Sequence, residues 1–433
     1  MPQAGREDGG RTTARRVTVE SVSAVDVEAA AARLEGVVTR TPLEPNPRLS
    51  ARTGAEVWLK REDLQVVRSY KLRGAYNLIV GLEEWARAEG VVGASAGNHA
   101  QGLAFACRAL GVPGRVYLPR TTPRQKRQRI AALGGDLVDI RVVGDTYDDA
   151  ATAALEDVAR SGAVLVPAFD DPRTVAGQGS VICEVMEQLD RAPDVVVVPV
   201  GGGGLVAGMA TWLRERHPEV RVVGVEPAGA ASMAAALAAG EPVALPVVDS
   251  FVDGAAVRRV GEVTFPLVRD AAVELTAVAE GRVCSEMLEL YQADGIIAEP
   301  AGALAPAALG DVVHVEPGAV VVAVLSGGNN DVSRYAEIVE RSLVHEGRKH
   351  YFLVDFPQEP GALRRFLDEV LGRDDDITLF EYVKRNNRET GPALVGVELS
   401  RPEDLADLLV RMEAAPPRIE RIEPDSPAFR FLL

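Results

Sequence analysis

One lysine stands in a basic segment where its amine could react with a carbonyl compound. The lysine is Lys71, within Arg68–Gly74 (RSYKLRG), and an apolar pattern of helical period predicts a helix over about residues 72–81. A lysine amine is reactive only without its proton, and nearby positive charge favours that loss. Arg68 and Arg73 could supply this charge. Taken alone, however, the segment is more typical of three solvated cations.

Four consecutive glycines give the sharpest signal in the chain. They directly follow Val195–Val200, an apolar run that predicts a strand buried on both faces. Glycines at the end of such a strand let the backbone approach a phosphate and point several N–H groups at it. No lysine follows as in a nucleotide-binding loop, so a lone phosphate is favoured, although a tight helix–strand crossing is an alternative. The run consists of Gly201, Gly202, Gly203 and Gly204, followed by Leu205.

Another polar turn lies between a predicted strand and a predicted helix, in Ser95–Gly102 (SAGNHAQG). Ser95, Gly97 and Asn98 offer backbone N–H groups at the start of that helix, where a substrate carboxylate would be stabilised. Ser95 or Asn98 could equally be a simple helix cap. His99 is more typical of a packing or orienting residue than of a base or a metal ligand.

A hydroxyl follows the last long apolar run. Ser326, in the sequence LSGGN, comes after Val320–Leu325, which predicts a second fully buried strand. In a parallel sheet the carboxyl ends of the strands share one edge, and ligands bind there. The four polar segments are therefore expected to converge on one site.

The elements that must position these residues alternate between helical patterns and short Val-rich runs, which predicts an α/β fold with largely parallel sheets. The composition turns polar near residue 345, and a second pattern begins there. We expect a tail over residues 1–20, a core over 21–345 and a separate domain over 346–433.

The last domain shows a βαββαβ order typical of an α+β ferredoxin-like module. The expected strands are His350–Phe356, Ile377–Lys384, Ala393–Leu399 and, at the end, Phe429–Leu432, and the expected helices are Ala362–Leu371 and Glu403–Met412.

The composition excludes several classes of function. A formal net charge of -16 disfavours nucleic acid and anionic membranes as partners, because the summed field repels phosphate. No run reaches the roughly 18 apolar residues of a membrane span, and the N-terminus lacks an apolar signal segment, so we expect a cytoplasmic protein. The histidines and cysteines show neither metal-site nor disulfide spacing, and no metal is expected.

Taken in order, the motifs resemble those of the threonine dehydratases, which belong to the pyridoxal-phosphate enzymes of fold type II. The resemblance covers about Val25 to Ser342 and implies that residues 21–345 form the two-domain catalytic core of that fold, with its smaller subdomain at about 60–160. Six ordered motifs are far more specific than any one of them. They are RSYKLRGA, SAGNHAQG, PAFDDPRTVAGQG, PVGGGGL, AEPAGAL and LSGGN.

Carried over position by position, the resemblance implies that Lys71 binds pyridoxal 5′-phosphate covalently and acts as the base at the substrate Cα. Gly201–Gly204 and Leu205 would hold the cofactor phosphate. Asn98 would hydrogen-bond the 3′-oxygen of the ring, and Ser326 would face the pyridine nitrogen. Three residues would lie near the substrate carboxylate: Ser95, Gly97 and His99.

The implied reaction is elimination of water from L-threonine, which yields 2-oxobutanoate and ammonia as the first step of isoleucine biosynthesis. A neutral hydroxyl opposite the pyridine nitrogen makes the ring a weaker electron sink, which suits elimination. Related serine racemases carry a second serine where this chain has Ala96. Since alanine cannot move a proton, racemisation is expected to be weak or absent.

The C-terminal sequence HYFLVDFPQEPGALRRFLDEVLG resembles the ACT-like regulatory domain of the shorter biosynthetic threonine dehydratases, which have one such module. The resemblance implies isoleucine as inhibitor, valine as its antagonist, and a homotetramer. A module that only mediates oligomerisation is the alternative.

Three other functions were weighed. A catabolic serine/threonine dehydratase would usually lack the C-terminal module, and a β-replacement enzyme resembling cysteine synthase fits the motifs less well. A non-catalytic amino-acid sensor is disfavoured by the intact Lys71. The preference between L-threonine and L-serine stays open. Two further segments, Arg120–Arg129 and Asp253–Val257 (DGAAV), suggest no chemistry beyond a solvated helix face and a turn.

Overall fold

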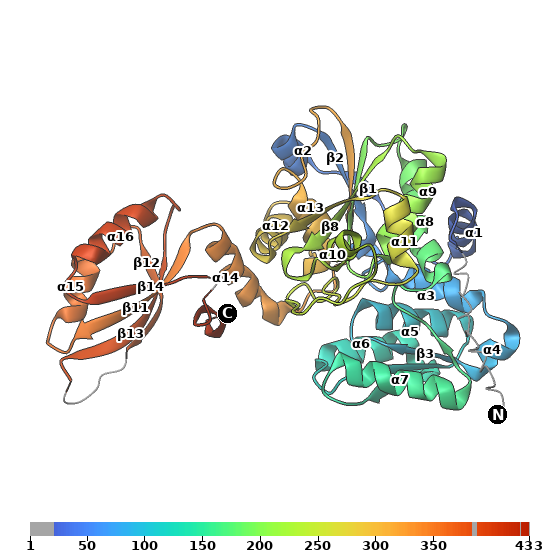
Figure 1. The fold of residues 1–433 in the computed structure, drawn as a ribbon, viewed down its shortest axis with the longest axis horizontal. Coiled ribbons are helices and arrows are strands. Elements are labelled where there is room, and N and C mark those ends of the chain that lie inside the picture. Colours follow the sequence, from blue (N-terminus) through green and yellow to red (C-terminus); the bar gives the residue numbers. More distant parts are fainter. Residues whose placement is uncertain (1–20, 383–387, 425, 433) are drawn as a thin grey trace, which may run out of the picture.

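The computed structural model describes residues 21–382, 388–424 and 426–432. The expected N-terminal tail over residues 1–20 lies outside these ranges. Figure 1 shows a large and a small subdomain in contact, and a C-terminal domain that stands apart from both and joins them through helix α14 (Tyr335–His345). In the described ranges, no helix has both the length and the apolar character needed to cross a membrane.

The large subdomain is built on a six-stranded sheet in the order β1-β2-β10-β7-β8-β9, parallel except for β1. Every residue of β7 and β10 is buried, as the near-continuous apolar runs predicted. Alternate valines of β7 face two separate cores, one on each side of the sheet. The strands are β1 (Leu43–Pro45), β2 (Glu56–Arg61), β7 (Val195–Pro199), β8 (Arg221–Pro227), β9 (Glu274–Val278) and β10 (Val320–Leu325).

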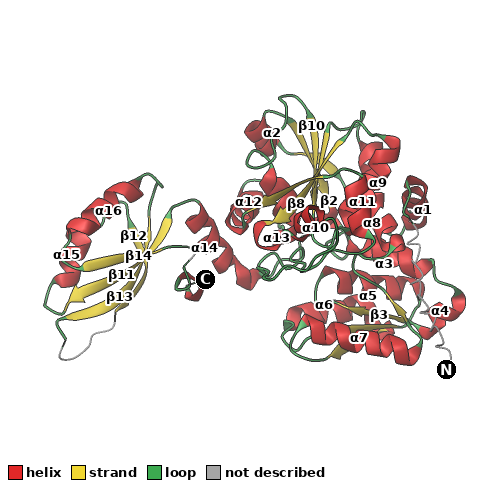
Figure 2. Ribbon diagram, viewed as in Figure 1, coloured by secondary structure: helices red, strands yellow, loops and turns green. Residues whose placement is uncertain are grey.

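Helices cover both faces of this sheet (Figure 2). One core packs α2, α12 and α13 against the strands, and the other packs α1, α8, α9, α10 and α11. This layering is that of an open α/β domain. The helices are α1 (Ala24–Leu34), α2 (Pro47–Thr53), α8 (Pro172–Gln188), α9 (Gly204–Arg216), α10 (Ser232–Ala239), α11 (Thr264–Asp270), α12 (Glu280–Gln292) and α13 (Pro300–Ala308).

The small subdomain has a parallel four-stranded sheet in the order β5-β4-β3-β6. Helix α7 packs on one face, while α3 to α6 form the core of the other. Helix α3 also contacts α8 of the large subdomain, so it lies between the two sheets. The elements are β3 (Val91–Ala94), β4 (Gly114–Leu118), β5 (Val138–Val142), β6 (Val164–Leu165), α3 (Lys71–Val80), α4 (Glu84–Glu89), α5 (Asn98–Leu110), α6 (Arg124–Gly134) and α7 (Tyr147–Ser161).

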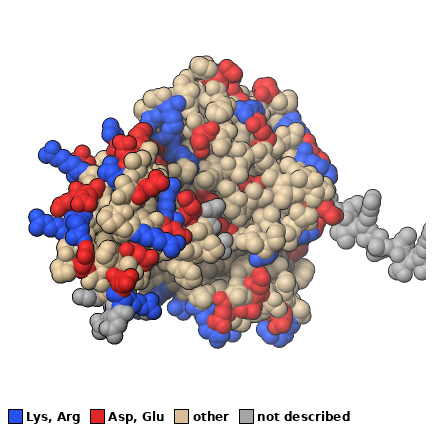
Figure 3. Space-filling view, turned by 60° about the vertical axis from the view of Figure 1, so that its left-hand side comes forward, with Lys and Arg blue, Asp and Glu red and all other residues tan. Residues whose placement is uncertain are grey.

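The C-terminal domain has an antiparallel sheet in the order β12-β13-β11-β14, which is the strand order of a ferredoxin-like fold. Helices α15 and α16 pack on one face of the sheet. On the surface in Figure 3, acidic and basic side chains are interspersed, without a large patch of one sign. The elements are β11 (Lys349–Pro357), α15 (Ala362–Glu369), β12 (Asp376–Tyr382), β13 (Thr390–Glu398), α16 (Asp404–Ala414) and β14 (Arg418–Ile422).

The expected last strand was wrong in its position. Residues Phe429–Phe431 form a turn of 3-10 helix, and the last strand is β14, Arg418–Ile422. Its sequence, RIERI, lacks the period-2 alternation of a half-buried strand, because its two isoleucines are three residues apart: Ile419 packs against the helices and Ile422 packs on the opposite face of the sheet. Phe429, near the C-terminus, instead packs beside Tyr351 and Ile422 on the face of the sheet away from the helices.

A buried ion cluster ties the two subdomains together behind Lys71. Arg73, on α3, has a side chain only 1% exposed and makes two hydrogen bonds to Glu62, whose side chain is fully buried. Arg73 also pairs with Glu184 of α8 at 2.7 Å, and Glu184 pairs in turn with the buried Lys60 of β2 at 2.6 Å. Strand β2, helix α3 and helix α8 are thereby joined through charge.

We predict that Arg73→Met strongly destabilises the catalytic core. Glu62 would be left as an unpaired buried carboxylate, which costs on the order of 3–5 kcal/mol. The thermal unfolding of the holoenzyme, followed by calorimetry, measures the loss. The double variant Arg73→Met/Glu62→Gln serves as the control and should recover part of the stability, because Glu62 no longer carries an unpaired charge. A single variant as stable as the wild type would contradict this account.

Candidate active site

The polar loops that the sequence singled out meet between the two subdomains. The residues Ser69 and Gly327 form an isolated antiparallel bridge, and the amide of Tyr70 donates to the carbonyl of Ser326 at 3.3 Å. The lysine segment is thus fixed to the loop that follows β10. Helix α5 packs closely on the same segment, since a Cβ at Gly102 would lie 2.9 Å from the backbone nitrogen of Leu72. The expected convergence at the carboxyl ends of the strands is present.

Lys71 is the first residue of α3 and is half-buried. Its Nζ donates to the carbonyl of Ala168 at 3.2 Å and lies 5.1 Å from the centre of the Tyr70 ring. Arg73 does not offer the free positive charge that the sequence suggested, because Glu62 and Glu184 neutralise it in the interior. The amine therefore lies in a partly desolvated place with a backbone carbonyl as its partner.

The backbone just before Lys71 is strained. Arg68 has a φ of 57°, a left-handed conformation that side chains other than glycine rarely adopt. It is held by hydrogen bonds at both ends, from its amide to Gln65 and to its carbonyl from Gly328. Such strain persists only where the surroundings impose it, and it is concentrated at functional sites. Here it sets the direction in which the chain enters α3.

The four glycines form a tight loop at the N-terminus of α9. Behind the loop, a Cβ at Gly202 would lie 2.4 Å from the Phe169 ring, and one at Gly201 would lie 2.9 Å from Cα of Ala255. Gly203 has a φ of 92°, which also requires glycine. The close packing and the phosphate interpretation are compatible, because the first turn of α9 leaves backbone N–H groups without intrahelical partners.

A short segment connects the glycine loop to the lysine. Ala168, which accepts the hydrogen bond from Lys71, is followed directly by Phe169, whose ring packs against Gly202 and whose backbone lies close to Gly204. A phosphate at the start of α9 and an aldehyde at the lysine would therefore belong to one small molecule. This segment lies in the motif PAFDDPRTVAGQG, to which the sequence alone assigned no role.

Asn98 begins α5 and is held by two side chains. Its Nδ2 donates to Oε1 of Glu299 at 2.5 Å, and its Oδ1 accepts from Nδ2 of Asn329 at 2.8 Å. Asn329 also donates to the carbonyl of Val67. Val67 lies two residues before Ser69, which forms the bridge to Gly327. The amide of Asn98 is thus oriented rather than free to rotate.

Glu299 is a residue of the site that the sequence reasoning missed. It is 5% exposed, and burial followed by the charge of Asp253 raises the pKa of its carboxyl to about 7, while the Asn98 hydrogen bond acts in the opposite direction. The sequence holds a signal for it: an acid before a proline at the start of α13, whose residues are all buried. The motif AEPAGAL had been quoted only as part of the resemblance.

His99 is buried and its ring is neutral near pH 7. Its Nε2 lies 2.7 Å from the carbonyl of Val166 and must carry the proton, while Nδ1 has no hydrogen-bond partner in the described chain. Burial, and then the charge of Lys71, lowers the pKa of His99 to about 4. The ring therefore holds a fixed tautomer and is poorly suited to act as a base.

Three further residues that the sequence singled out are Ser95 and Ala96, in the turn before α5, and Ser326, after β10. The hydroxyl of Ser95 accepts from the amide of Gly97 at 3.2 Å, so Ser95 supports the turn itself. Ala96 lies between them, half-buried against the core of the small subdomain. At the opposite side of the site, Ser326 is 3% exposed and its hydroxyl donates to the carbonyl of Ala301 at 3.2 Å.

These groups fit pyridoxal 5′-phosphate. A lysine amine, a glycine-rich helix N-terminus, an oriented amide and a buried hydroxyl are the donors that an aldehyde-bearing, phosphorylated pyridine requires. The packing of the glycine loop is consistent with a phosphate site, because Phe169, Ala255 and Met233 leave no room for side chains there and the loop backbone stays uncovered by side chains of its own.

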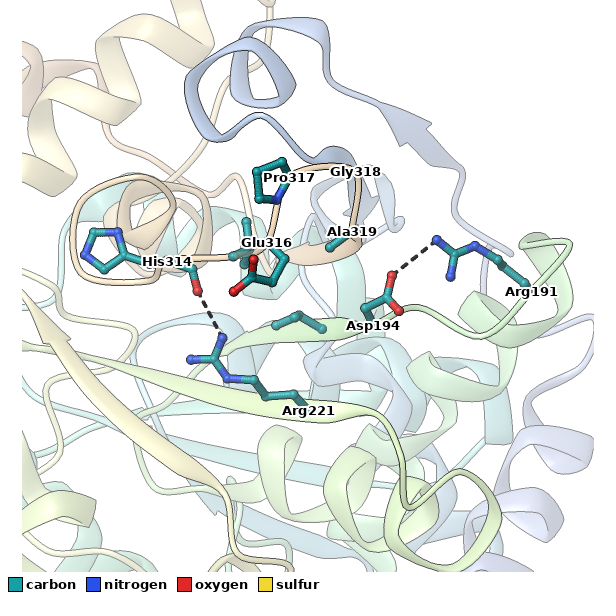
Figure 4. Close-up of a pocket in the computed structure, with 10 residues that line it drawn as sticks. Arg191, Asp194, Arg221, His314, Glu316, Pro317, Gly318 and Ala319 are labelled. Carbon is teal, nitrogen blue, oxygen red and sulfur yellow. Dashed lines mark hydrogen bonds and ion pairs between the residues drawn. The ribbon is translucent and has the colours of Figure 1, made fainter.

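The large subdomain also has a cavity that lies apart from this site. It has a volume of about 590 Å³ and lies at the opposite, amino-terminal edge of the large sheet, beside the starts of β7, β8 and β10 (Figure 4). Both of its arginines are already paired: Arg191 with Asp194 at 3.2 Å, and Arg221 with Glu274 and the carbonyl of His314. None of the residues proposed from the sequence lines it.

Two family models match the chain, one that ends before α14 and one that begins within it. Residues 34–327 match a family described as pyridoxal-phosphate dependent enzyme, and residues 340–432 match the C-terminal regulatory domain of threonine dehydratase. The chain is 65% identical to L-threonine dehydratase biosynthetic IlvA of Mycobacterium tuberculosis over 95% of this chain and 96% of that protein.

Solved structures agree with this similarity. The processed form of threonine deaminase isoform 2 from Solanum lycopersicum has a TM-score of 0.69 and 39% identity, over 73% of this chain and 92% of that one. A maize serine racemase has the same TM-score with 29% identity, over 75% of this chain and 99% of that one.

The raised pKa of Glu299 predicts a change in stability with pH. Between its ordinary value of 4.5 and about 7 the folded chain keeps a proton that the unfolded chain has lost, so the folded state loses stability as pH rises through this window. Glu299→Gln has no such proton. Relative to the wild type, the variant should gain up to about 3 kcal/mol of stability between pH 4.5 and pH 8.

Thermal unfolding of both proteins at several pH values tests the prediction. Glu83→Gln, which changes an exposed carboxylate on the small subdomain, is the control and should follow the wild type. A difference between Glu299→Gln and the wild type that does not vary with pH would show that Glu299 does not hold a proton near neutrality.

Proposed function

The chain belongs to the biosynthetic L-threonine dehydratases, and on that premise we propose that it converts L-threonine to 2-oxobutanoate and ammonia, the first step of isoleucine biosynthesis. One observation carries the proposal most directly. The amine of Lys71 donates to the carbonyl of Ala168, and the following residue, Phe169, packs against the glycine loop at the start of α9. An amine and a phosphate site at that spacing favour a pyridoxal-phosphate enzyme.

Pyridoxal phosphate, when bound, supplies an electron sink that acidifies the substrate Cα hydrogen. Lys71 would hold the cofactor and then, as a free amine, remove the Cα proton. The amides at Gly201–Leu205 would bind the phosphate. Asn98, fixed by Glu299 and Asn329, would direct its amide at the ring 3′-oxygen, while Ser326 would give the pyridine nitrogen a neutral partner.

The substrate carboxylate is assigned to the turn before α5. The start of this helix offers backbone N–H groups and a positive dipole end, both of which favour an anion. Ser95 and Gly97 form the turn, and His99 fixes it to the small-subdomain sheet through Val166. Closing the small subdomain on the substrate would exclude water from the reacting atoms.

Lys71→Ala should abolish the release of 2-oxobutanoate from L-threonine, lowering kcat by several orders of magnitude, because both the covalent link and the base are lost. The measurement is a coupled assay of 2-oxobutanoate, together with the absorbance of bound cofactor. Lys71→Arg is a second variant that keeps a positive charge at the site and should be equally inactive. A wild-type rate in either variant would refute the assignment.

The C-terminal domain is proposed to bind isoleucine as an inhibitor, with valine as antagonist. The match of residues 340–432 to a regulatory domain supports regulation, and the position of the domain at the end of α14 leaves its sheet and helices accessible. An effector acts only by binding two states of the enzyme with different affinity.

Isoleucine at millimolar concentration should therefore raise the L-threonine concentration needed for half-maximal rate by at least severalfold, and added valine should reverse the effect. Initial rates at varied L-threonine, with and without each amino acid, measure it. Leucine serves as an isomeric control for non-specific effects. Unchanged kinetics with isoleucine would favour a domain that only mediates assembly.

Two related assignments complete the proposal. A catabolic serine/threonine dehydratase is less well supported, because the chain carries the regulatory domain, although L-serine is a plausible second substrate from its shared β-hydroxyl. We place the enzyme in the cytoplasm as a homotetramer, in line with the family resemblance. The described cysteines are unpaired, as is usual for a reducing compartment.

A further inference from the structure

The loop that the sequence analysis left without chemistry lies at a junction of three parts of the molecule. Asp253, in the loop between α10 and α11 of the large subdomain, has a side chain 44% exposed. Its Oδ2 accepts from Nζ of Lys126 at 2.9 Å, and Lys126 belongs to α6 of the small subdomain. This ion pair spans the gap between the two subdomains.

The same carboxylate faces the helix that carries the C-terminal domain. Nη1 of Arg334, one residue before α14, lies 3.7 Å from the other oxygen of Asp253. Arg334 is anchored in place because its Nη2 donates to the carbonyl of Phe251 at 2.7 Å and its guanidinium lies 4.8 Å from the centre of the Phe251 ring. Arg341, about two turns further along the chain in α14, lies over the same ring at 4.3 Å.

The loop also touches the catalytic groups. Ala255 is the backbone contact that excludes a side chain at Gly201 of the glycine loop. A Cβ at Gly254 would lie 2.8 Å from Ala301 and 4.0 Å from the carboxylate of Glu299. A displacement of Asp253 would therefore be felt both at the phosphate site and beside Asn98.

We propose that Asp253 is a shared anchor. Lys126 of the small subdomain holds one oxygen of its carboxylate while Arg334, just before α14, lies near the other, so a closer approach of Arg334 competes with Lys126 for the same charge. When Lys126 holds the carboxylate, the small subdomain is kept against the site. When α14 moves so that Arg334 takes it, that hold is weakened. The regulatory part of this inference rests on the proposed function, whereas the anchoring itself does not.

The strength of the pair suits such a role. An ion pair at this exposure contributes at most about fivefold to an equilibrium, or about 1 kcal/mol, and salt screens it. A small movement of α14 can break a contact of this strength. It could not break a buried pair such as Arg73–Glu62, because that would leave an unpaired charge in the interior. Lys126 and Arg334 act here as positioning residues and not as catalytic ones.

Removing the small-subdomain partner tests the anchor. Lys126→Met should raise the KM for L-threonine two- to fivefold with less than a twofold change in kcat, because closure is weakened and the reacting groups are intact. Tetramethylammonium chloride at high concentration should raise the KM of the wild type toward that of the variant and change the variant little. Arg120→Met, which removes an ion pair with Asp145 confined to the small subdomain, is the matched control.

Amide hydrogen exchange of the holoenzyme gives a readout that does not depend on activity. Without substrate, peptides covering 124–134 should exchange faster in Lys126→Met than in the wild type and in Arg120→Met. Arg334→Gln removes the competing cation and should slow the same peptides. Arg341→Gln, which also removes a cation from the Phe251 ring but does not approach Asp253, should leave them unchanged.

The outcomes separate this inference from the proposed function. Exchange of 124–134 that is unaltered in Lys126→Met overturns the anchor, even if L-threonine is a substrate. Exchange that is unaltered or faster in Arg334→Gln overturns the competition. Conversely, a wild-type protein without L-threonine deamination refutes the proposed function, while the exchange differences would still support Asp253 as the anchor.

Discussion

The buried pair of Arg73 and Glu62 is the interaction on which the site depends. Two charges in the interior are tolerated because each oxygen and each guanidinium nitrogen in contact has a partner, among them Thr41 and Ser180. Arg73 lies two residues after Lys71 on α3, so the same contact that stabilises the core fixes where the reactive amine emerges. Replacing the cluster by apolar residues could preserve stability, but it would remove the directional link between β2, α3 and α8.

Around the amine, the site is built from groups whose charge has been suppressed. His99 is kept neutral by burial, and Glu299 keeps a proton to about pH 7. A neutral Glu299 can offer a proton as well as accept one, so it can orient Asn98 without placing a full negative charge near the ring. Ser326 is neutral by nature. A cofactor held here would therefore be surrounded mainly by neutral hydrogen-bonding groups.

The sequence predicts the architecture well where periodicity and burial are strong. Val195–Val200 and Val320–Leu325 identify the two central strands, and the glycines after the first mark the start of α9. It fails where a contact joins distant segments. Nothing local to Arg73 shows that Glu62 will neutralise it, and nothing local to Glu299 shows that Asn98 will lie at 2.5 Å. The strand β14 was missed because its two isoleucines, three residues apart, do not show the alternation of a strand.

The contrast between buried and exposed charge explains how one chain can be both rigid and adjustable. Ion pairs behind Lys71 are removed from water, so breaking one leaves a costly unpaired group and the geometry has a single solution. Asp253 lies in solvent, where exchanging one cation for another costs little. The buried ion pairs thus fix the geometry around Lys71, where the reaction needs fixed distances. The weak ion pairs of Asp253 lie between the subdomains, where we propose movement. A regulatory domain attached through α14 meets the catalytic core at the second kind of contact.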